Sequence, residues 1–542
     1  MGVKNKGGGM TSEATKKNER HAVVVVGSGI NSLVCAALLA QRGKRVLVLE
    51  RNDRAGGCIR TEELFPGFTH EVLSSWYPLF TSGAAYARLK DDLAAQGIEF
   101  LDNGYTTGVV GSDGRGLALR NDVGDGVQRI NDFAAGDGAA FGQMASQLFE
   151  RDAALTFGLL GSEPYSRGLL GLLFSQWRKR RLDGMVQYGR ESLESFRRWA
   201  EREVKDNRVR GMMAPWVLHS GLGPDDASSA LIGKLTFAAV VAGGMPVVKG
   251  GGQNLVRALC AIIEKAGGRI QLNTEVEEIL LDGQKSRGVR AGGQVYEASD
   301  AVVCNVTPPQ LYGRLLPAAP AAVREQAQAY RFGRGDMQIH IALDGMPNWS
   351  DPELLKVPLL HLSDGLEDVS MSVAQANNGL IPAKPTVAIG QPCAVDPGRA
   401  PQGKWILWMQ MQDMPSRLRG DAAGTIAVPA DGQWTDAVRD AVSERIIDQL
   451  EAIMPGLRRQ IIGVKVLSPA DLEKTNCNLV GGDPYSGVCS PDQFFWMRPF
   501  ASTQGARAHR TPYKNVYHIG ASTHPGPGLA GASGFMVAQQ IR

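Results

Sequence analysis

Apolar residues near the amino end of the chain form two short unbroken runs with a helical pattern between them. Val23–Val26 is a continuous β-branched run, which is typical of a parallel strand buried on both faces, and Val46–Leu49 is a second continuous apolar run. Between these runs, small and apolar residues recur at helical spacing over 33–40, and Gly43 stands where a C-terminal cap is expected. The pattern predicts a strand–helix–strand unit over residues 21–50.

The turn between the first run and the helix carries the candidate chemistry. Gly27 permits a sharp turn, Gly29 lets the backbone approach a pyrophosphate, and the helix N-terminus offers free N–H groups to phosphates. The second run ends in Glu50, an acid placed to bind a ribose hydroxyl. Ser32 takes the place of the third glycine. Together these features predict a dinucleotide-binding fingerprint.

The residues that follow the acid narrow the choice of dinucleotide. The pair Gly56-Gly57 and then Arg60-Thr61 follow Glu50, an order that resembles FAD-dependent oxidoreductases of the glutathione-reductase type. In those proteins the second glycine pair lies against the cofactor. The alternative, an NAD-binding Rossmann domain, lacks this extension, so we expect FAD.

The rest of the chain alternates between strand and helix patterns. We expect strands and turns over 102–127, and a mostly helical insertion over 132–241, including a helix at 192–204, that covers a substrate site. Further strands are expected at 269–272, 276–280, 301–305, 338–343, 386–389, 405–411 and 515–520, and further helices at 254–266, 434–454 and 532–541. The glycine-rich stretch before 254–266 has Leu255 at the third glycine position and Asn273 where an acid is needed, so no nicotinamide site is predicted.

Composition excludes several classes of function. The 542 residues are 43% hydrophobic and 21% charged, and 58 Lys and Arg face 55 Asp and Glu, so no nucleic-acid partner is expected. The seven cysteines contain no C-x-x-C pair, which indicates neither a disulfide framework nor a zinc site and favours a reducing, cytoplasmic location. Residues 1–20 are polar, Gly- and Lys-rich and lack an apolar core, so we expect a disordered leader.

Motifs at both ends of the chain resemble one family. They are GSGINSL at 27–33, ERNDRAGG at 50–57, VKGGG at 248–252, TEV at 274–276 and IGASTHPGPGLAG at 519–531. The chain resembles the phytoene desaturase (phytoene dehydrogenase-related) family, within the flavin amine oxidase superfamily. True amine oxidases usually carry Gly-Glu-Ala-Thr near residue 520, and here Ser522 stands where their acid would be. Leu73 and Ser74 replace a Gly-Pro that is usual in carotenoid desaturases.

The resemblance implies an α/β fold with a discontinuous, Rossmann-like FAD-binding domain of the glutathione-reductase type, over 21–78, 243–310 and 481–542. An α+β substrate domain would take 79–242 and 311–480. The same resemblance implies that Glu50 binds the adenosine ribose and that the Val276 backbone binds the adenine of non-covalent FAD. The remaining implied cofactor residues are Gly27, Ser28, Gly29, Ile30 and Asn31 at the pyrophosphate, Arg51, Gly56, Gly57, Arg60 and Asn305 along the cofactor, and Gly520, Ala521, Gly528, Leu529 and Ala530 at the isoalloxazine.

Three other features have two interpretations each. His524 either handles a proton beside the flavin or only shapes the turn that it forms with Pro525. Lys249 either lies near the flavin, as a lysine does in amine oxidases, or lies on the surface. The aromatic segment 494–499 either packs in the core or forms an apolar substrate wall.

The segment 168–181 combines an apolar, aromatic run with the basic cluster Arg178-Lys-Arg-Arg181. One interpretation is a buried helix whose basic last turn complements its dipole. The other is a peripheral contact with an anionic membrane surface.

These features predict an FAD-dependent oxidoreductase that dehydrogenates an apolar, isoprenoid or lipid-like substrate by hydride transfer to flavin N5, with oxygen or a quinone as electron acceptor. Amine oxidation and redox-neutral isomerisation are the catalytic alternatives. A non-enzymatic alternative is lipid binding of the Rab GDP-dissociation-inhibitor type, which the intact glycine motifs oppose. No metal-ligand or Ser/His/Asp pattern stands out, and the sequence does not predict an oligomeric state.

Overall fold

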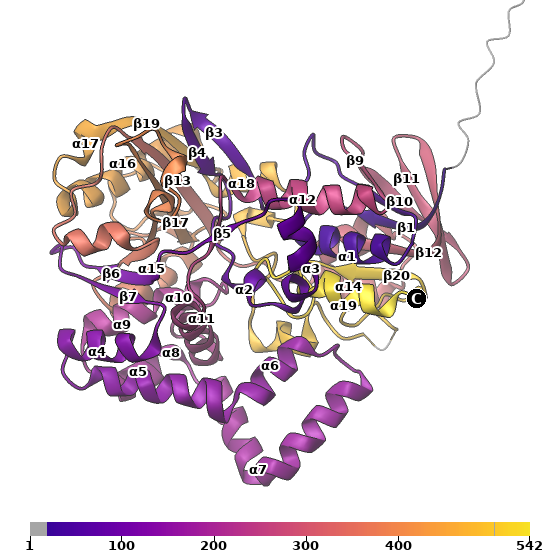
Figure 1. Cartoon of the computed structure of the whole chain (residues 1–542), viewed down its shortest axis with the longest axis horizontal. Helices are drawn as coiled ribbons and strands as arrows, with labels where there is room; N and C mark the ends of the chain where they lie inside the picture. Colours follow the sequence, from indigo (N-terminus) through magenta and orange to yellow (C-terminus); the bar gives the residue numbers. More distant parts are fainter. Residues whose placement is uncertain (1–18, 503) are drawn as a thin grey trace, which may run out of the picture.

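The computed structural model describes residues 19–502 and 504–542, which contain two seven-stranded β-sheets with helices packed on them (Figure 1). Most of the predicted leader lies outside the described residues, but Glu19 and Arg20 already belong to the first strand. The first sheet has the order β10-β11-β12-β1-β2-β9, with β20 beside β12. Its strands are β1 (Glu19–Val26), β2 (Val46–Leu49), β9 (Arg269–Gln271), β10 (Val276–Asp282), β11 (Lys285–Ala291), β12 (Gln294–Asn305) and β20 (Val516–Ile519).

The centre of this sheet is parallel, as the β-branched runs predict. Strand β1 pairs in parallel with both β2 and β12, and β12 with β20. Residues Val23–Val26 are between 0% and 6% exposed because the sheet is covered on both faces. On one face lie α1 (Ile30–Gln41), α3 (Ala84–Ala95), α12 (Gly252–Lys265) and α19 (Ala532–Gln540). The other face packs on α14 (Ala321–Gln328) and the segment 311–316 before it.

The second sheet has the order β19-β13-β17-β16-β14-β6-β7 and is mostly antiparallel. Its strands are β6 (Tyr105–Val110), β7 (Gly116–Arg120), β13 (Gly335–Leu343), β14 (Leu359–Leu362), β16 (Val387–Gly390), β17 (Trp405–Met414) and β19 (Ile461–Leu467). Helix α16 (Asp436–Ile453) packs in one core with this sheet. A second core joins it to α4 (Val123–Phe133), α5 (Asp137–Ser146), α8 (Phe196–Glu203), α9 (Asn207–Met213), α10 (Pro215–Leu218), α11 (Ser229–Gly243) and α15 (Leu366–Asn377).

Short elements complete the described fold. They are the strands β3 (Thr61–Phe65), β4 (Phe68–Glu71), β5 (Phe100–Leu101), β8 (Val247–Val248), β15 (Leu380–Ile381) and β18 (Gly420–Asp421), and the helices α2 (Pro78–Thr81), α13 (Pro308–Gln310), α17 (Leu457–Gln460) and α18 (Pro469–Thr475). The first sheet takes its strands from three separate stretches of the chain and the second from residues 105–467. The exact domain boundaries stay predictions.

A buried ion network fastens the two sheets together. Arg399 is 1% exposed and donates to Glu71 (3.1 Å) and Asp396 (2.7 Å). Glu71 also accepts from the backbone of Gly252, and Asp396 from that of Gly250. The side chains at the end of β4 therefore hold the 248–252 glycine segment against the second sheet, in agreement with the rule that buried charges are paired.

Three sequence-based predictions need correction. Residues 123–127 are not turn or strand: they begin α4, because the Asp122 side chain caps its first turn by accepting from Asp125 N. The helix expected at 192–204 is interrupted, because the chain leaves helical geometry at Glu194 and Ser195 caps the separate helix α8. The buried helix considered for 168–181 is wrong. That segment lies in α7 (Arg167–Leu193), which has only two buried residues, Leu169 and Gln176.

Helix α7 and its neighbour α6 (Ala153–Gly161) extend from one side of the molecule, at the bottom of Figure 1. Non-helical backbone at Arg181 (φ 59°) bends α7 into two limbs. No helix in residues 19–502 and 504–542 has the length and apolar character needed to cross a bilayer.

Candidate functional site

A cleft opens at the carboxyl ends of β1, β2 and β12, beside the N-terminus of α1. Ligands commonly bind at such an edge of a parallel sheet. The predicted residues that line the cleft together are Gly27, Ser28, Gly29, Ile30, Asn31, Glu50, Arg51, Gly56, Gly57, Val276, Asn305, Ala521 and Leu529. Arg60, Gly520, Gly528, Ala530 and His524 are not among the lining residues.

Close backbone contacts require the glycines of this cleft. Gly27 and Gly57 have φ values of 86° and 61°, which side-chain-bearing residues rarely adopt. A Cβ on Gly57 would lie 3.1 Å from Gly29 Cα, so the second glycine pair packs directly on the first turn. Gly29 caps α1 without a side chain, and the first turn of α1 has no acidic residue. The positive end of the helix is thus left for an anion.

Glu50 ties the end of β2 to the glycine turn. Its carboxylate accepts hydrogen bonds from Ser28 N (2.9 Å), Ser28 Oγ (2.6 Å) and Asn52 N (2.9 Å), and the residue is 6% exposed. The acid is therefore buried at the floor of the cleft, where it holds the turn in shape.

The far side of the cleft is formed by β10, β12 and the loop after β20. The side chain of Asn305, at the end of β12, donates to Ser32 Oγ (3.0 Å), and a Cβ on Gly520 would lie 2.2 Å from its Oδ1. Val276 is 3% exposed, and its carbonyl accepts from Arg314 Nη1 (2.9 Å). Gly520 therefore lies directly behind the lining residues, although it does not line the cleft itself.

Other predicted residues lie away from the cleft. Arg60 forms an ion pair with Glu62 (2.5 Å), and Gly528 is exposed. Lys249 has a side chain that is 60% exposed and pairs with Glu99 (2.8 Å), as its surface interpretation predicts.

The structure adds cleft residues that sequence reasoning missed. Asn478 donates to the Asn305 carbonyl (3.2 Å) and accepts from Thr307 N (3.2 Å), while Gln310 donates to the Cys477 carbonyl (2.8 Å). Lining residues outside the prediction include Asn52, Cys58, Thr274, Glu275, Gln310, Arg314, Asn476, Cys477, Asn478, Ser486 and Ser522. The polar run Asn476-Cys-Asn478 was the available signal, but it lies within the stretch expected to belong to the substrate domain.

His524 lies in the loop after β20 and is 1% exposed. Its Nε2 donates to the Leu160 carbonyl (3.1 Å), and its own carbonyl accepts from His509 Nε2 (2.8 Å). Burial, with a smaller effect of the His509 ring, lowers the pKa of His524 to about 4. The imidazole is therefore neutral at physiological pH and bonded to the end of α6.

Arg498 organises the aromatic segment before this loop. It is fully buried and donates to the carbonyls of Ala521 (2.7 Å) and Tyr485 (3.0 Å), among others. Phe494 packs in the core, whereas Trp496 is 36% and Met497 40% exposed. The segment is therefore partly core and partly surface.

The segment 73–76 lies between the cleft and the second sheet. Ser74 Oγ donates to the carbonyl of the lining residue Cys58 (2.6 Å), and Gln338 of β13 donates to the Leu73 carbonyl (3.1 Å). The ring centroids of Trp76 and Trp408 are 5.2 Å apart. The segment 73–76 thus runs from a cleft-lining residue to the second sheet, with Leu73 and Trp76 packed in apolar clusters.

Comparisons with known proteins agree with this geometry. The family model for flavin containing amine oxidoreductases matches residues 33–542. A rat protein named pyridine nucleotide-disulfide oxidoreductase domain-containing protein 2 is 26% identical, over 94% of this chain and 91% of its own. The zeta-carotene-forming phytoene desaturase of Myxococcus xanthus is 27% identical, over 94% of this chain and 90% of its own.

Solved structures share the fold at lower identity. An oxidoreductase from Methanosarcina mazei superposes with a TM-score of 0.58 at 17% identity, over 96% of this chain and 99% of its own. Cyclohexylamine oxidase from Brevibacterium oxydans gives 0.56 at 14% identity, over 96% and 99%. The glycine cradle, the unblocked helix N-terminus and the buried acid fit a dinucleotide. The chain therefore belongs to the flavin-containing amine oxidoreductase family, and it is an oxidoreductase whose cofactor is FAD.

Proposed function

We propose that this protein dehydrogenates an apolar, isoprenoid or lipid-like substrate, with FAD held non-covalently in a domain of the glutathione-reductase type. FAD, when bound, supplies the hydride acceptor, and oxygen or a quinone would take the electrons on. The observation that carries the proposal is the connection of the glycine-lined cleft, through the segment 73–76, to the aromatic pair Trp76 and Trp408 beside the second sheet.

The residues of this chain would bind and orient the cofactor. Gly27, Gly29 and the first turn of α1 would hold the pyrophosphate through backbone N–H groups and the helix dipole. Glu50 would bind the adenosine ribose, and the Val276 backbone the adenine. The N-terminus of α19, which begins just after the 520–531 loop, would stabilise negative charge at the isoalloxazine.

The residues on the substrate side of the cleft would exclude water and orient the substrate. Leu73 is 6% exposed, and the Trp76 and Trp408 rings lie beside the same segment, so a hydrocarbon chain would find apolar contacts there. His524 would shape the loop, because its Nε2 is bonded to the Leu160 carbonyl. Dehydrogenation would transfer a hydride from one carbon to the cofactor and release a proton from the neighbouring carbon to water, without a base from His524.

Amine oxidation on the same scaffold is the principal alternative, and solved structures of amine oxidases share the fold. Against it stands the position of Lys249, which is exposed and paired with Glu99 rather than directed at the cleft. The names of several relatives, including the phytoene desaturase of Myxococcus xanthus, favour the proposed dehydrogenation.

An anaerobic mixing experiment tests the proposal. Purified yellow holoprotein is mixed with an isoprenoid lipid pool and, separately, with an amine pool, and loss of the oxidised flavin absorbance is followed. We expect bleaching by the isoprenoid pool and release of FAD by acid. Bleaching by amines alone would establish amine oxidation. An isomer formed without net bleaching would establish the redox-neutral alternative, and a folded, colourless protein that cannot be reconstituted would favour lipid binding.

A further inference from the structure

Large apolar side chains are concentrated on the outside of the segment 153–193, which contains α6 and α7 and is called the arm below. Within the described chain, eight of the fifteen exposed large hydrophobic residues belong to it. These are Phe157 (42%), Tyr165 (43%), Leu170 (66%), Phe174 (58%), Trp177 (45%), Leu182 (66%), Val186 (62%) and Leu193 (59%). A concentration of exposed apolar side chains in one segment marks an interaction surface.

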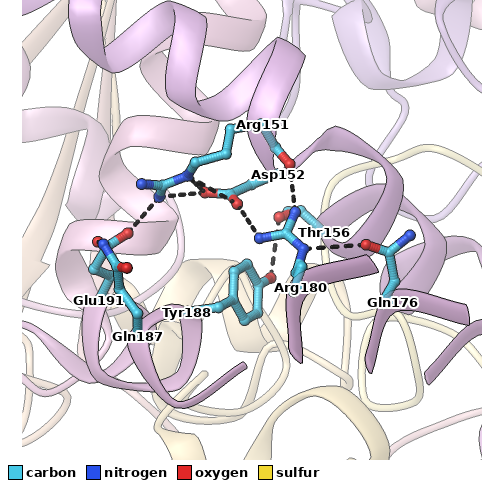
Figure 2. Close-up of polar contacts among 8 residues, drawn as sticks. All are labelled: Arg151, Asp152, Thr156, Gln176, Arg180, Gln187, Tyr188 and Glu191. Atoms are coloured by element: carbon cyan, nitrogen blue, oxygen red, sulfur yellow. Dashed lines mark hydrogen bonds and ion pairs between the residues drawn. The ribbon is translucent and has the colours of Figure 1, made fainter. Parts of the chain in front are cut away.

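The inner side of the arm is polar (Figure 2). Asp152, which is 8% exposed, pairs with Arg180 (2.6 Å) and with Arg151 (2.6 Å). Arg180 also donates to Gln176 (3.1 Å), whose exposure is 6%. In the second limb, Tyr188 shares a hydrogen bond with Thr156 (3.0 Å), and Glu191 pairs with Arg151.

This polarity is the reverse of that in a helix on the surface of a soluble domain, which turns its apolar stripe inward. Rotation of α7 to bury Phe174 and Trp177 would separate Arg180 from Asp152 and leave both charges without partners. Because an uncompensated buried charge is strongly unfavourable, the network fixes the apolar side outward. Exposed apolar side chains lie on both limbs, Phe174 and Trp177 before the bend at Arg181 and Leu182 and Val186 after it.

The charges on the arm indicate what covers it. Arg167, Arg178, Lys179, Arg181 and Arg190 are all exposed, and none forms an ion pair with a carboxylate anywhere in residues 19–502 and 504–542. Asp183 is the one exposed acid in the arm. A symmetric contact with a second copy would bring these cations against each other, whereas an anionic headgroup layer would neutralise them.

We propose that the arm docks on an anionic lipid bilayer, with the outer sides of α6 and α7 lying in the plane of the membrane interface. The apolar and aromatic side chains would enter the boundary between headgroups and acyl chains, and the free cations would contact the headgroups. The surface is wider than the segment 168–181 that the sequence indicates, because it also includes Phe157, Leu182, Val186 and Leu193.

Hydrogen bonds connect the arm to the loop that follows β20. Glu163, in the loop between α6 and α7, contacts His509 (2.6 Å), and the Leu160 carbonyl accepts from His524. The base of the arm is thus bonded to the loop that follows β20, so docking would bring this loop close to the bilayer. Delivery of a lipid-like substrate by this route rests on the proposed function, but docking does not.

Vesicle cosedimentation tests the proposal without turnover. Full-length holoprotein is mixed with phosphatidylcholine vesicles with and without phosphatidylglycerol. We expect at least roughly tenfold tighter binding to the anionic vesicles, weakening as salt rises, since each basic residue near the surface contributes roughly a fivefold factor and the arm exposes several of them. Equal binding to both vesicle types, or no binding to either, would overturn the proposal.

Two arm variants and a matched control locate the surface. One variant carries Phe174→Ser and Trp177→Ser, and the other Arg178→Gln, Lys179→Gln and Arg181→Gln. The control, Met371→Ser with Ile462→Ser, removes exposed apolar side chains elsewhere (59% and 47%). We expect each arm variant to lose at least tenfold in affinity for anionic vesicles, with unchanged flavin absorbance and melting temperature, and the control to bind as wild type.

Two results would overturn the assignment of the surface. One is wild-type binding by both arm variants, which would place the contact elsewhere. The other is a dimer of the wild-type protein that the Phe174→Ser, Trp177→Ser variant converts to a monomer in size-exclusion chromatography, which would show that a second copy covers the arm. A variant that fails to fold is replaced by Leu182→Gln with Val186→Gln in the second limb.

Discussion

Helices α1 and α7 are both rich in Leu, yet they are used in opposite ways. Ten of the twelve residues of α1 are buried, and its N-terminus faces the cleft without a competing side chain. Only Leu169 and Gln176 of the 27 residues of α7 are buried, and Arg180, Tyr188 and Glu191 form the network with the preceding segment. Leucine thus packs in the core in one helix and is largely exposed in the other.

The two helices differ in the contacts that hold them in place. Helix α1 is fixed by apolar packing against the first sheet, so its chemistry is left to the backbone at its end. Helix α7 is fixed by a buried ion network, so its apolar side chains are left to solvent or to a partner (Figure 2). Four predictions test this contrast, from the largest expected effect to the smallest.

Removing Asp152, the acid at the centre of the ion network that holds the arm, should have the largest effect. Asp152→Ala leaves Arg180 mostly buried without its carboxylate, a change worth about 3–5 kcal/mol. We expect this loss in the local unfolding free energy of α7, measured by hydrogen exchange of residues 167–193, with little change in α1. Asp183→Ala, which removes an exposed acid of the same helix, is the control and should stay within about 0.5 kcal/mol. Equal effects of the two variants would mean that the network does not hold the arm.

Glu50→Gln tests the chemistry at the end of α1. It removes a charged acceptor for Ser28 and, in the proposed role of Glu50, for the ribose hydroxyls, an interaction of about 1.5–3 kcal/mol, so FAD affinity should fall roughly ten- to a hundredfold. Fluorescence titration of the apoprotein with FAD measures it. Glu62→Gln, in the ion pair of Arg60 outside the cleft, is the matched control. Unchanged affinity in Glu50→Gln would show that the fingerprint is wrongly assigned.

His524→Ala tests the contact between α6 of the arm and the loop that follows β20. Loss of the bond to the Leu160 carbonyl should lower stability by about 1 kcal/mol and weaken FAD retention, while the remaining holoprotein should reduce at a near-normal rate. A chemical role would instead lower the rate of flavin reduction by roughly a hundredfold or more at full FAD occupancy. Stopped-flow reduction at matched FAD content separates the two outcomes.

The pH dependence of the same variant gives an independent check. Burial lowers the pKa of His524 to about 4, below the value of about 6.5 expected in the unfolded chain. As the pH falls from 6.5 towards 4, the unfolded state takes up a proton that the folded state does not, so stability falls across this window. His524→Ala should remove its part of this loss in urea unfolding curves. An ionisation near pH 6.5 in the wild-type rate profile that the variant lacks would instead indicate catalysis.

The smallest effect is expected on the outer side of α7. Leu182→Ala, at a side chain 66% exposed, should change the free energy of unfolding by less than about 0.5 kcal/mol. Its counterpart Leu33→Ala, fully buried in α1, should cost about 2–5 kcal/mol. Urea unfolding in the absence of lipid measures both. A large loss in Leu182→Ala would mean that the arm buries this side chain in solution, and the contrast between the helices would fail.

The sequence by itself determined the elements whose reason is local. A short unbroken apolar run predicts a buried parallel strand wherever it lies, so Val23–Val26 and Val46–Leu49 fall in β1 and β2. A positive φ favours glycine, so Gly27 and Gly57 mark turns without knowledge of the fold. The strand at 516–519 and the helix after Gly531 were also predictable from the local pattern of residues.

Only the tertiary structure decided which segments meet and which side of a helix is buried. Asn478 reaches the cleft through its bond to Asn305, a contact between residues 173 positions apart that no local pattern encodes. The bend at Arg181 has no glycine or proline at that position, and the outward side of α7 follows from Asp152, which lies in another element. Hydrogen-bond partners and burial depend on residues distant in the chain, and periodicity reports only the residues nearby.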